Sequence, residues 1–192
     1  MKLEEIWVNP PRDEYLDDKN HYFDNATPVV SIKGLILKRS VRDSDVFYGL
    51  FKDDVLVGYL GLTHRPDGKY QVGLSQLAQA YKGQGLGTFL YDYAILNDNR
   101  VVLSDNRQTP DSQQLWNRFR QNVHFNVVPF DLNTNEPTVA TDEQVYSSDH
   151  LVWMATPTGK TINESLSDIN AMYKGDRYVV WYGSSSDGYV NY

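Results

Sequence analysis

Three alternating glycines, Gly83, Gly85 and Gly87, are the residues of this chain whose spacing most directly implies chemistry. They lie in a turn between an apolar strand pattern and an amphipathic helix that Thr88 opens. A turn of this kind aims several backbone N–H groups at one point, which is also the positive end of the helix dipole. Glycine suits it because a side chain would block a ligand lying close to the backbone or would require a disfavoured φ. The turn therefore predicts a site for the pyrophosphate of a nucleotide-like cofactor.

The strand patterns before the turn predict antiparallel hairpins. Apolar and aromatic residues dominate four segments, which are 29–37 (interrupted at Gly34), 46–51, 55–62 and 70–78. Short turn signals separate the last three segments, whereas residues 39–45 are predicted to be a charged connection. Strands joined by short turns pair antiparallel. The last of these strands leads directly into the glycines and has to position them.

The elements after the glycine turn complete the prediction of the fold. A short strand at 100–104, a helix with the start signal Thr109-Pro110-Asp111, and strands at 124–130 and 151–155 follow in order. The polar residues 131–149 are expected to form a loop. This order predicts an α/β (α+β) fold with a mixed, mostly antiparallel sheet. We expect an irregular N-terminal arm over 1–27, one domain over 28–158, and a C-terminal helix–strand extension over 159–192 that packs on it.

Composition restricts the classes of function. The 192 residues carry a net charge of −7 and include no cysteine, so neither disulfides nor thiolate chemistry is expected. The four histidines lack ligand spacing, and no metal site is predicted. An acidic chain argues against a nucleic-acid binder and suits a cationic acceptor such as an amine. With no long apolar run or apolar leader, a cytoplasmic protein without membrane contact is expected.

The spacing of the glycines separates this loop from two common phosphate loops. A dinucleotide fingerprint needs G-x-G-x-x-G, and a P-loop needs Lys followed by Ser or Thr, but the chain has G-x-G-x-G and no such pair. Residues 82–87, Lys-Gly-Gln-Gly-Leu-Gly, instead resemble the pyrophosphate loop of the GCN5-related N-acetyltransferase (GNAT) family. That family has Gln/Arg-x-x-Gly-x-Gly/Ala at a strand–helix junction, and here Lys82 replaces the usual first residue. The resemblance covers roughly residues 46–155.

The resemblance implies an acyl-CoA-dependent N-acyltransferase that uses acetyl-CoA or another acyl-CoA. The acceptor would be an amine, on a small molecule or a protein, that attacks the thioester directly. The cofactor would lie where its strand splays from the next strand, and a backbone N–H near Leu77 would polarise the thioester carbonyl. The cofactor-binding residues that the resemblance implies are Ser75, Gln76, Leu77, Lys82, Gly83, Gln84, Gly85, Leu86, Gly87 and Thr88.

The expected catalytic acid is the point at which the chain departs from the family. Many members carry Asn-x-x-Ala-x-x-Leu-Tyr, whose Tyr protonates the leaving thiolate, but Thr109 and Trp116 replace that Asn and Tyr. An indole N–H is not a practical proton source near neutral pH. Three alternatives follow: another group such as Ser112 or a water serves, the thiolate leaves unassisted, or the protein binds CoA without turnover.

In the last case the protein would be a catalytically inactive CoA-binding or protein-interaction module. If it is an enzyme, two further candidates for acid or base follow from their places in the chain. Asp105 comes after the short strand that follows the cofactor helix, and His124 opens a later strand. The C-terminal strand pattern at 178–182 could pair with its own sheet or with a second copy, which would give a homodimer.

Overall fold

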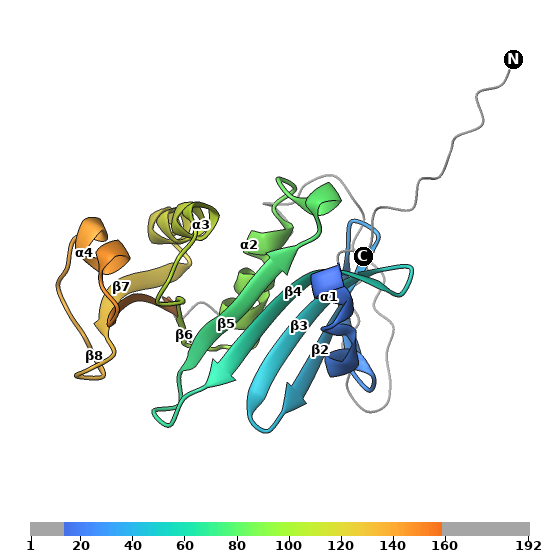
Figure 1. Cartoon of the computed structure of the whole chain (residues 1–192), viewed down its shortest axis with the longest axis horizontal. Coiled ribbons are helices and arrows are strands. Elements are labelled where there is room, and N and C mark those ends of the chain that lie inside the picture. The colour runs from blue at the N-terminus through green and yellow to red at the C-terminus, as the bar shows by residue number, and fades with distance from the viewer. Residues whose placement is uncertain (1–13, 159–192) are drawn as a thin grey trace, which may run out of the picture.

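The computed structural model describes residues 14–158, in which nine strands form one sheet with the order β1-β2-β3-β4-β5-β6-β9-β7-β8 (Figure 1). Neighbouring strands pair antiparallel except β5 and β6, which are parallel. The mixed, mostly antiparallel α/β fold predicted from the sequence is therefore confirmed. The strands span Thr27–Ile32 (β1), Leu35–Arg42 (β2), Asp45–Lys52 (β3), Val55–His64 (β4), Tyr70–Leu77 (β5), Val102–Leu103 (β6), Phe125–Asp131 (β7), Glu136–Pro137 (β8) and Leu151–Pro157 (β9).

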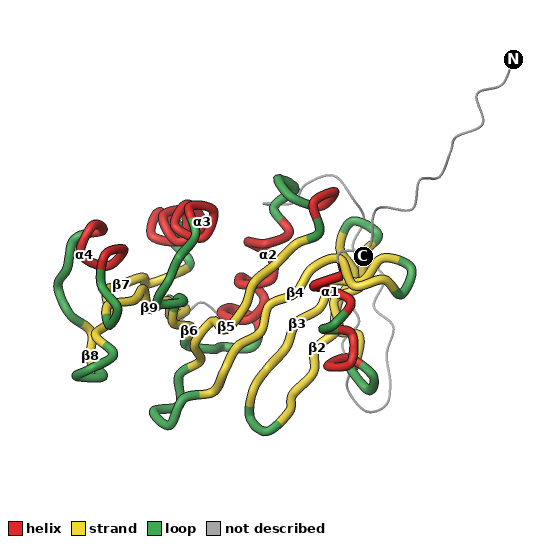
Figure 2. The backbone as a smooth tube through the Cα atoms, in the orientation of Figure 1, coloured by secondary structure: helices red, strands yellow, loops and turns green. Residues whose placement is uncertain are grey.

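Helices pack on both faces of the β1–β5 part of the sheet (Figure 2). Because alternate residues of a strand point to opposite faces, Tyr48 of β3 lies in the core cluster of Leu90, whereas Phe47 packs with Phe23. We call these two sides the α2 face and the η1 face. None of the helices within residues 14–158 is long and apolar enough to cross a bilayer. The helices span Glu14–Asp17 (α1), Asn20–Phe23 (η1), Gln79–Tyr81 (η2), Leu86–Asp92 (α2), Tyr93–Asn97 (η3, a π-helical continuation of α2), Pro110–Gln121 (α3) and Asp142–Ser147 (α4).

The parallel strands β5 and β6 diverge soon after they meet. Their register contains only Tyr70 opposite Val102 and Gln71 opposite Leu103. Beyond this point β5 continues to Leu77 without a partner strand on that side in the described part of the chain. A bulge adds to the divergence, because the register with β4 shifts where Gly73 is the extra residue, and bulges increase the local twist. The sheet is thus open along one edge of the strand that leads to the glycines.

The prediction for residues 29–45 was wrong in its elements. Instead of one interrupted strand and a charged connection, β1 and β2 form a hairpin, and β2 continues to Arg42. Lys33 and Gly34 form its turn with φ values of 49° and 71°. A two-residue turn of type I′ requires a positive φ at both central positions. Arg39 and its neighbours extend the strand because they pair with β3, and their side chains are exposed or half-buried, which suits polar residues.

The segment 131–149, predicted to be a loop, also contains regular structure. It forms β8 and α4, and Thr141 caps α4 in a reciprocal capping box with Gln144. The signal Thr-x-x-Gln is present in the sequence, but the helix is short and buries only Val145 fully. The predicted C-terminal helix and strand, and the first residues of the N-terminal arm, lie outside the described residues.

Candidate active site

The glycine loop joins η2 to α2 through two left-handed residues. Gly83 and Gly85 have φ values of 75° and 80°, which side chains other than glycine adopt only with strain. Gly85 is the N-cap of α2, and as a glycine it offers no side chain to accept from the N–H groups of the first helical turn. The helix starts at Leu86, two residues earlier than predicted. At Gly87 a Cβ would meet Leu77 Cδ1 at an ordinary 3.6 Å, so the fold itself does not demand glycine there.

Hydrogen bonds hold the loop in this conformation. The Gln84 side chain donates from Nε2 to the carbonyl of Ala80 at 3.0 Å. Lys33, in the β1–β2 turn, donates from Nζ to the carbonyl of Gln84 at 3.1 Å. In a trans peptide the carbonyl and the following N–H point in opposite directions, so the Gly85 N–H points away from Lys33. The Gln84 carbonyl thus faces the hairpin, and the N–H of the same peptide is turned the other way. Lys82 is exposed beside the loop.

The predicted residues of the cofactor strand β5 lie on two different faces. Ser75 is opposite Leu60 of β4 and shares its α2 face, whereas Gln76 is opposite Tyr59 on the η1 face. Tyr59 packs among aromatic rings there, and its burial, with Tyr22 next to it, raises the pKa of its hydroxyl. Leu77 packs against the main core. The backbone of all three residues belongs to the part of β5 that diverges from β6.

Trp116 is a core residue. It is fully buried, and its indole meets the rings of Tyr91 and Phe119 edge-on at centroid distances of 6.1 and 5.5 Å. Its Nε1 has no hydrogen-bond partner within residues 14–158. Ser112 lies in the first turn of the same helix, where its backbone N–H donates to the Thr109 hydroxyl at 3.3 Å. Trp116 therefore supplies no hydroxyl at the position where the resemblance implies one, whereas Ser112 stays a candidate.

Tyr91 of α2 was not singled out from the sequence. Its side chain is buried in the main core, where its ring packs against Trp116 and Phe119 of α3. Burial is the main reason that the pKa of Tyr91 is raised to about 12; the influence of Ser75 opposes the rise, and that of Asp105 adds to it. With 14 tyrosines in the chain, only packing could identify this one.

The other two candidates for acid or base, Asp105 and His124, lie in different parts of the fold. Asp105 follows β6, is partly buried, and accepts at Oδ1 from the backbone N–H of Arg107 at 3.3 Å. It lies close enough to Tyr91 to influence that hydroxyl. His124 lies just before β7, which β6 and β9 separate from β5 in the sheet. The fold thus brings Ser75, Tyr91 and Asp105 into one region and leaves His124 outside it. Within residues 14–158, no three His, Asp or Glu side chains converge to hold a metal ion.

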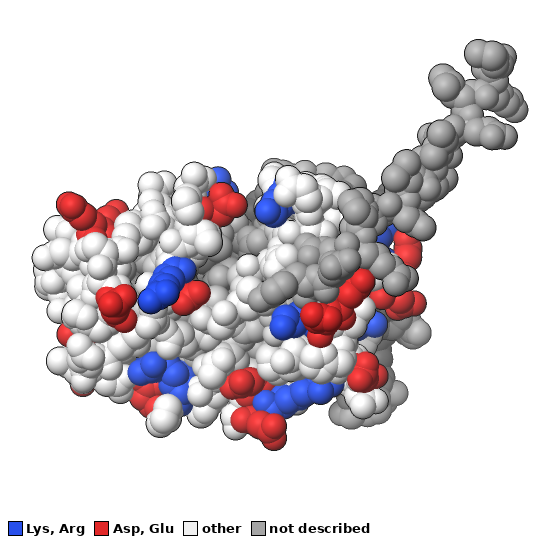
Figure 3. Space-filling model, viewed as in Figure 1, with Lys and Arg blue, Asp and Glu red and all other residues white. Residues whose placement is uncertain are grey.

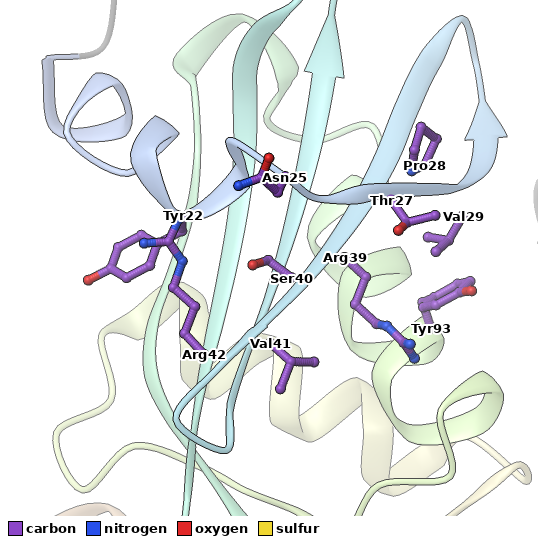
Figure 4. A pocket seen from close by; sticks show the side chains of 10 residues that line it. All are labelled: Tyr22, Asn25, Thr27, Pro28, Val29, Arg39, Ser40, Val41, Arg42 and Tyr93. Atoms are coloured by element: carbon purple, nitrogen blue, oxygen red, sulfur yellow. The ribbon is translucent and has the colours of Figure 1, made fainter.

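A separate open pocket of about 870 Å³ lies at the end of the β1–β2 hairpin opposite its turn (Figure 4). Both arginines that line it are engaged by the protein. Arg39 donates to Asp98 at 3.0 Å, and Arg42 donates to the carbonyl of His21 and lies over the ring of Tyr22. On the face of the molecule seen in Figure 3, basic and acidic side chains are interspersed. This pocket contains none of the residues predicted for the cofactor.

Comparisons with solved structures give distant likenesses. Escherichia coli ElaA is 15% identical over 61% of this chain and 71% of its own, with a TM-score of 0.39. The ribosomal-protein-S18-alanine N-acetyltransferase of Escherichia coli is 11% identical over 78% and 91%, with a TM-score of 0.37. A Bacillus anthracis acetyltransferase in complex with acetyl coenzyme A is 12% identical over 69% and 84%, also with a TM-score of 0.37.

A comparison with curated proteins gives no match. The sequence profile of the Acetyltransferase (GNAT) family matches residues 2–108, which is more than half of the chain and includes the hairpins, β5, the glycine loop, α2 and β6. The resemblance that the glycine loop suggested is therefore confirmed, and the chain belongs to the GNAT acetyltransferase family.

Proposed function

We propose that this protein is an acyl-CoA-dependent N-acyltransferase that transfers an acetyl group from acetyl-CoA to an amine. The observation that carries the proposal is the glycine loop, in a chain of the acetyltransferase family. Its two left-handed glycines lead from the diverging strand β5 into the first turn of α2, whose N-cap is Gly85. Such a turn accepts a pyrophosphate through backbone N–H groups.

The residues of this chain fit the cofactor in two ways. The edge of β5 beyond Gln71 has no neighbouring strand on that side within residues 14–158, and the backbone along it would bind the amide arm at Ser75, Gln76 and Leu77. The loop from Gly83 to Thr88 would bind the pyrophosphate. A donor on β5 near Leu77 would polarise the thioester carbonyl as negative charge develops on its oxygen.

The reaction would be a direct transfer. The amine nitrogen attacks the thioester carbonyl, the C–N bond forms, the C–S bond breaks, and CoA leaves as the thiolate. The amine loses one proton and the thiolate takes one up, so no further reactant is needed. The bound cofactor supplies the activated acyl group, and the protein positions both partners and stabilises the charge that moves to sulfur.

The first experiment measures thiol release from acetyl-CoA with a panel of small amines and amine-bearing peptides, together with CoA binding by calorimetry. We expect binding and release with at least one acceptor. Absence of both would contradict the proposal.

The second experiment places a side chain in the loop. Gly85→Glu should abolish CoA binding, because it obstructs the N–H groups and sets a negative charge beside the pyrophosphate. Gly68→Glu is the matched control, since Gly68 has the same φ of 80° in the β4–β5 turn, at the other end of β5. Both variants should lose similar stability, but only the first should lose affinity. Equal affinities would place the cofactor elsewhere.

A second candidate function is favoured by Trp116, which puts a core indole where the family's acid is expected. A CoA-binding protein without transferase activity would show affinity for CoA in calorimetry and no thiol release with any amine.

A further inference from the structure

We propose that the pocket beside the β1–β2 hairpin is a docking site for a short extended peptide that carries carboxylates. The pocket has a volume of about 870 Å³ (Figure 4). Pockets that hold a drug-sized ligand have about 300–1,000 Å³, so this one has room for a few residues of extended chain. None of the residues predicted for the cofactor line it, and the inference therefore goes beyond the proposed function and does not depend on it.

The edge of β2 offers main-chain groups to such a peptide at Val41. The two-residue turn of the hairpin is flanked by the opposed pair Ile32 and Leu35. Hydrogen-bonded pairs alternate along an antiparallel ladder, so the odd-numbered residues of β2 direct their N–H and C=O groups toward β1. The β2–β3 turn gives the same assignment, because its flanking pair makes the even-numbered residues face β3.

The partner strand ends before Val41 is reached. β1 pairs with β2 as far as Thr27 opposite Arg39, and within residues 14–158 no strand lies beside β2 beyond that pair on this side. Val41 is the next residue of the alternation and is 56% exposed, and it lines the pocket. An extended peptide can therefore add to the sheet here through its own main chain, as in β-strand addition.

The pocket is locally positive in a chain whose net charge is −7. Arg39 and Arg42 line it, and among the described residues neither Asp nor Glu does. Asp98 lies 3.0 Å from Arg39, but it also pairs with Arg100 at 3.6 Å, so one carboxylate faces two guanidinium groups. Arg42 donates to a backbone carbonyl, which leaves its charge in place. This excess of positive charge favours an acidic partner.

Both arginines are held in position before a ligand arrives. Arg42 lies over the ring of Tyr22 at 5.5 Å, and that ring packs in the aromatic core of the η1 face. Asp98, which holds Arg39, accepts from the Tyr48 hydroxyl at 2.7 Å. Each of these contacts uses one terminal nitrogen of a guanidinium group that has five N–H donors in a fork suited to carboxylates. A peptide carboxylate can therefore bind with little further loss of side-chain entropy.

The two arginines project from opposite faces of the sheet. Arg39 lies opposite Tyr48 on the α2 face, whereas Arg42 reaches Tyr22 on the η1 face. Successive side chains of a strand also point to opposite faces. A peptide paired with Val41 therefore meets both arginines best when it has two adjacent acidic residues.

Calorimetry with the full chain tests the recognition of charge. The probe is a blocked hexapeptide with two central glutamates flanked by valine and threonine, and the comparison peptide has two lysines in their place. We expect the lysine peptide to bind at least about tenfold more weakly, and Arg39→Gln or Arg42→Gln to raise the Kd of the glutamate peptide about tenfold. Arg118→Gln, which removes the same charge from an exposed position on α3, is the control and should leave the Kd unchanged. Equal Kd values for the two peptides, or binding of neither, would overturn the proposal.

The main-chain contact is tested at Val41. Val41→Pro removes an N–H that points away from the ladder with β3 and should abolish peptide binding, whereas Val41→Thr should keep it. The Kd for CoA should be the same in both variants, so a failure of the proposed function would not affect this result. If Val41→Pro does not fold, the glutamate peptide methylated at every backbone nitrogen decides the question, and it should not bind the wild-type chain.

Two outcomes would contradict the main-chain contact. Binding that survives loss of the peptide's or the protein's N–H groups would mean that the pocket takes an anion and not a strand. A Val41 amide that is already protected from hydrogen exchange in the free protein would show that this edge is covered.

Discussion

At position 116 the chain has a tryptophan that packs in the core, whereas the resemblance to the family implies a tyrosine hydroxyl there. The Trp116 indole is fully buried against Tyr91, Phe119 and the sheet, and its N–H finds no partner within the described residues. A buried indole of this size contributes to stability through its area and its aromatic contacts. The same packing holds the ring of Tyr91 in place.

The first prediction concerns this residue. Trp116→Ala should lower the free energy of unfolding by about 3–5 kcal/mol, because it leaves a cavity in the core. Trp116→Phe should lower the free energy of unfolding much less and should keep thiol release near the wild-type rate. Urea denaturation and the release assay check these outcomes. A Trp116→Phe variant that is stable but has lost its rate would show that the indole itself takes part in the reaction.

At the scale of elements, the β1–β2 hairpin is an unexpected part of the cofactor site. Its turn lies at the same end of the sheet as the carboxyl end of β5, and Lys33 reaches the Gln84 carbonyl from there. By fixing that carbonyl, the lysine fixes the direction of the following N–H. The hairpin thus positions a loop that lies about fifty residues further along the chain.

A change at this lysine tests the role of the hairpin. Lys33→Met should raise the Kd for CoA about five- to tenfold, which corresponds to one hydrogen bond of about 1 kcal/mol, with kcat little changed. Lys33→Arg should retain most of the affinity. Lys69→Met, at the other end of the sheet beside Asp67, is the control. Calorimetry measures the affinities, and a Kd unchanged in Lys33→Met would show that the loop holds its shape without the hairpin.

At the scale of the whole molecule, the sheet consists of two parts that meet at a narrow junction. The ladder between β5 and β6 has only two residue pairs, and side chains of Gln71 and Arg65 add hydrogen bonds to Asn106 and Asn135 across it. A cofactor lying in the opening would contact β5, the loop and the region after β6. It should therefore add contacts across a junction at which the strand pairing is short.

Amide hydrogen exchange tests this arrangement. At a CoA concentration of about 100 times Kd, binding should stabilise the folded state by about 2.7 kcal/mol. Protection should increase at residues 72–77 and 83–88, while residues 40–42 of β2, beside the pocket of Figure 4, should exchange as before. Increased protection at residues 40–42 instead would contradict this prediction, because it would show that CoA binds at the opposite end of the sheet.

The sequence by itself determined the features that depend on a few consecutive residues. The glycine turn, the hairpins around it and the Thr109 cap of α3 follow from local φ preferences, alternation and capping, and the structure contains them. The errors also have local causes. In the sequence, Lys33-Gly34 looks like a break within one strand rather than a hairpin turn. The polar residues at the end of β2 look like a connection, although they pair with β3.

Only the tertiary structure decided which side chains meet. Tyr91 and Trp116 come from two helices, and their ring contact depends on how α2 and α3 pack on the sheet. The burial of Trp116 and the divergence of β5 from β6 likewise result from packing among distant segments. The cofactor loop could be predicted because its chemistry belongs to the backbone of one short segment. The surroundings of position 116 could not, because they consist of side chains that only the folded core brings together.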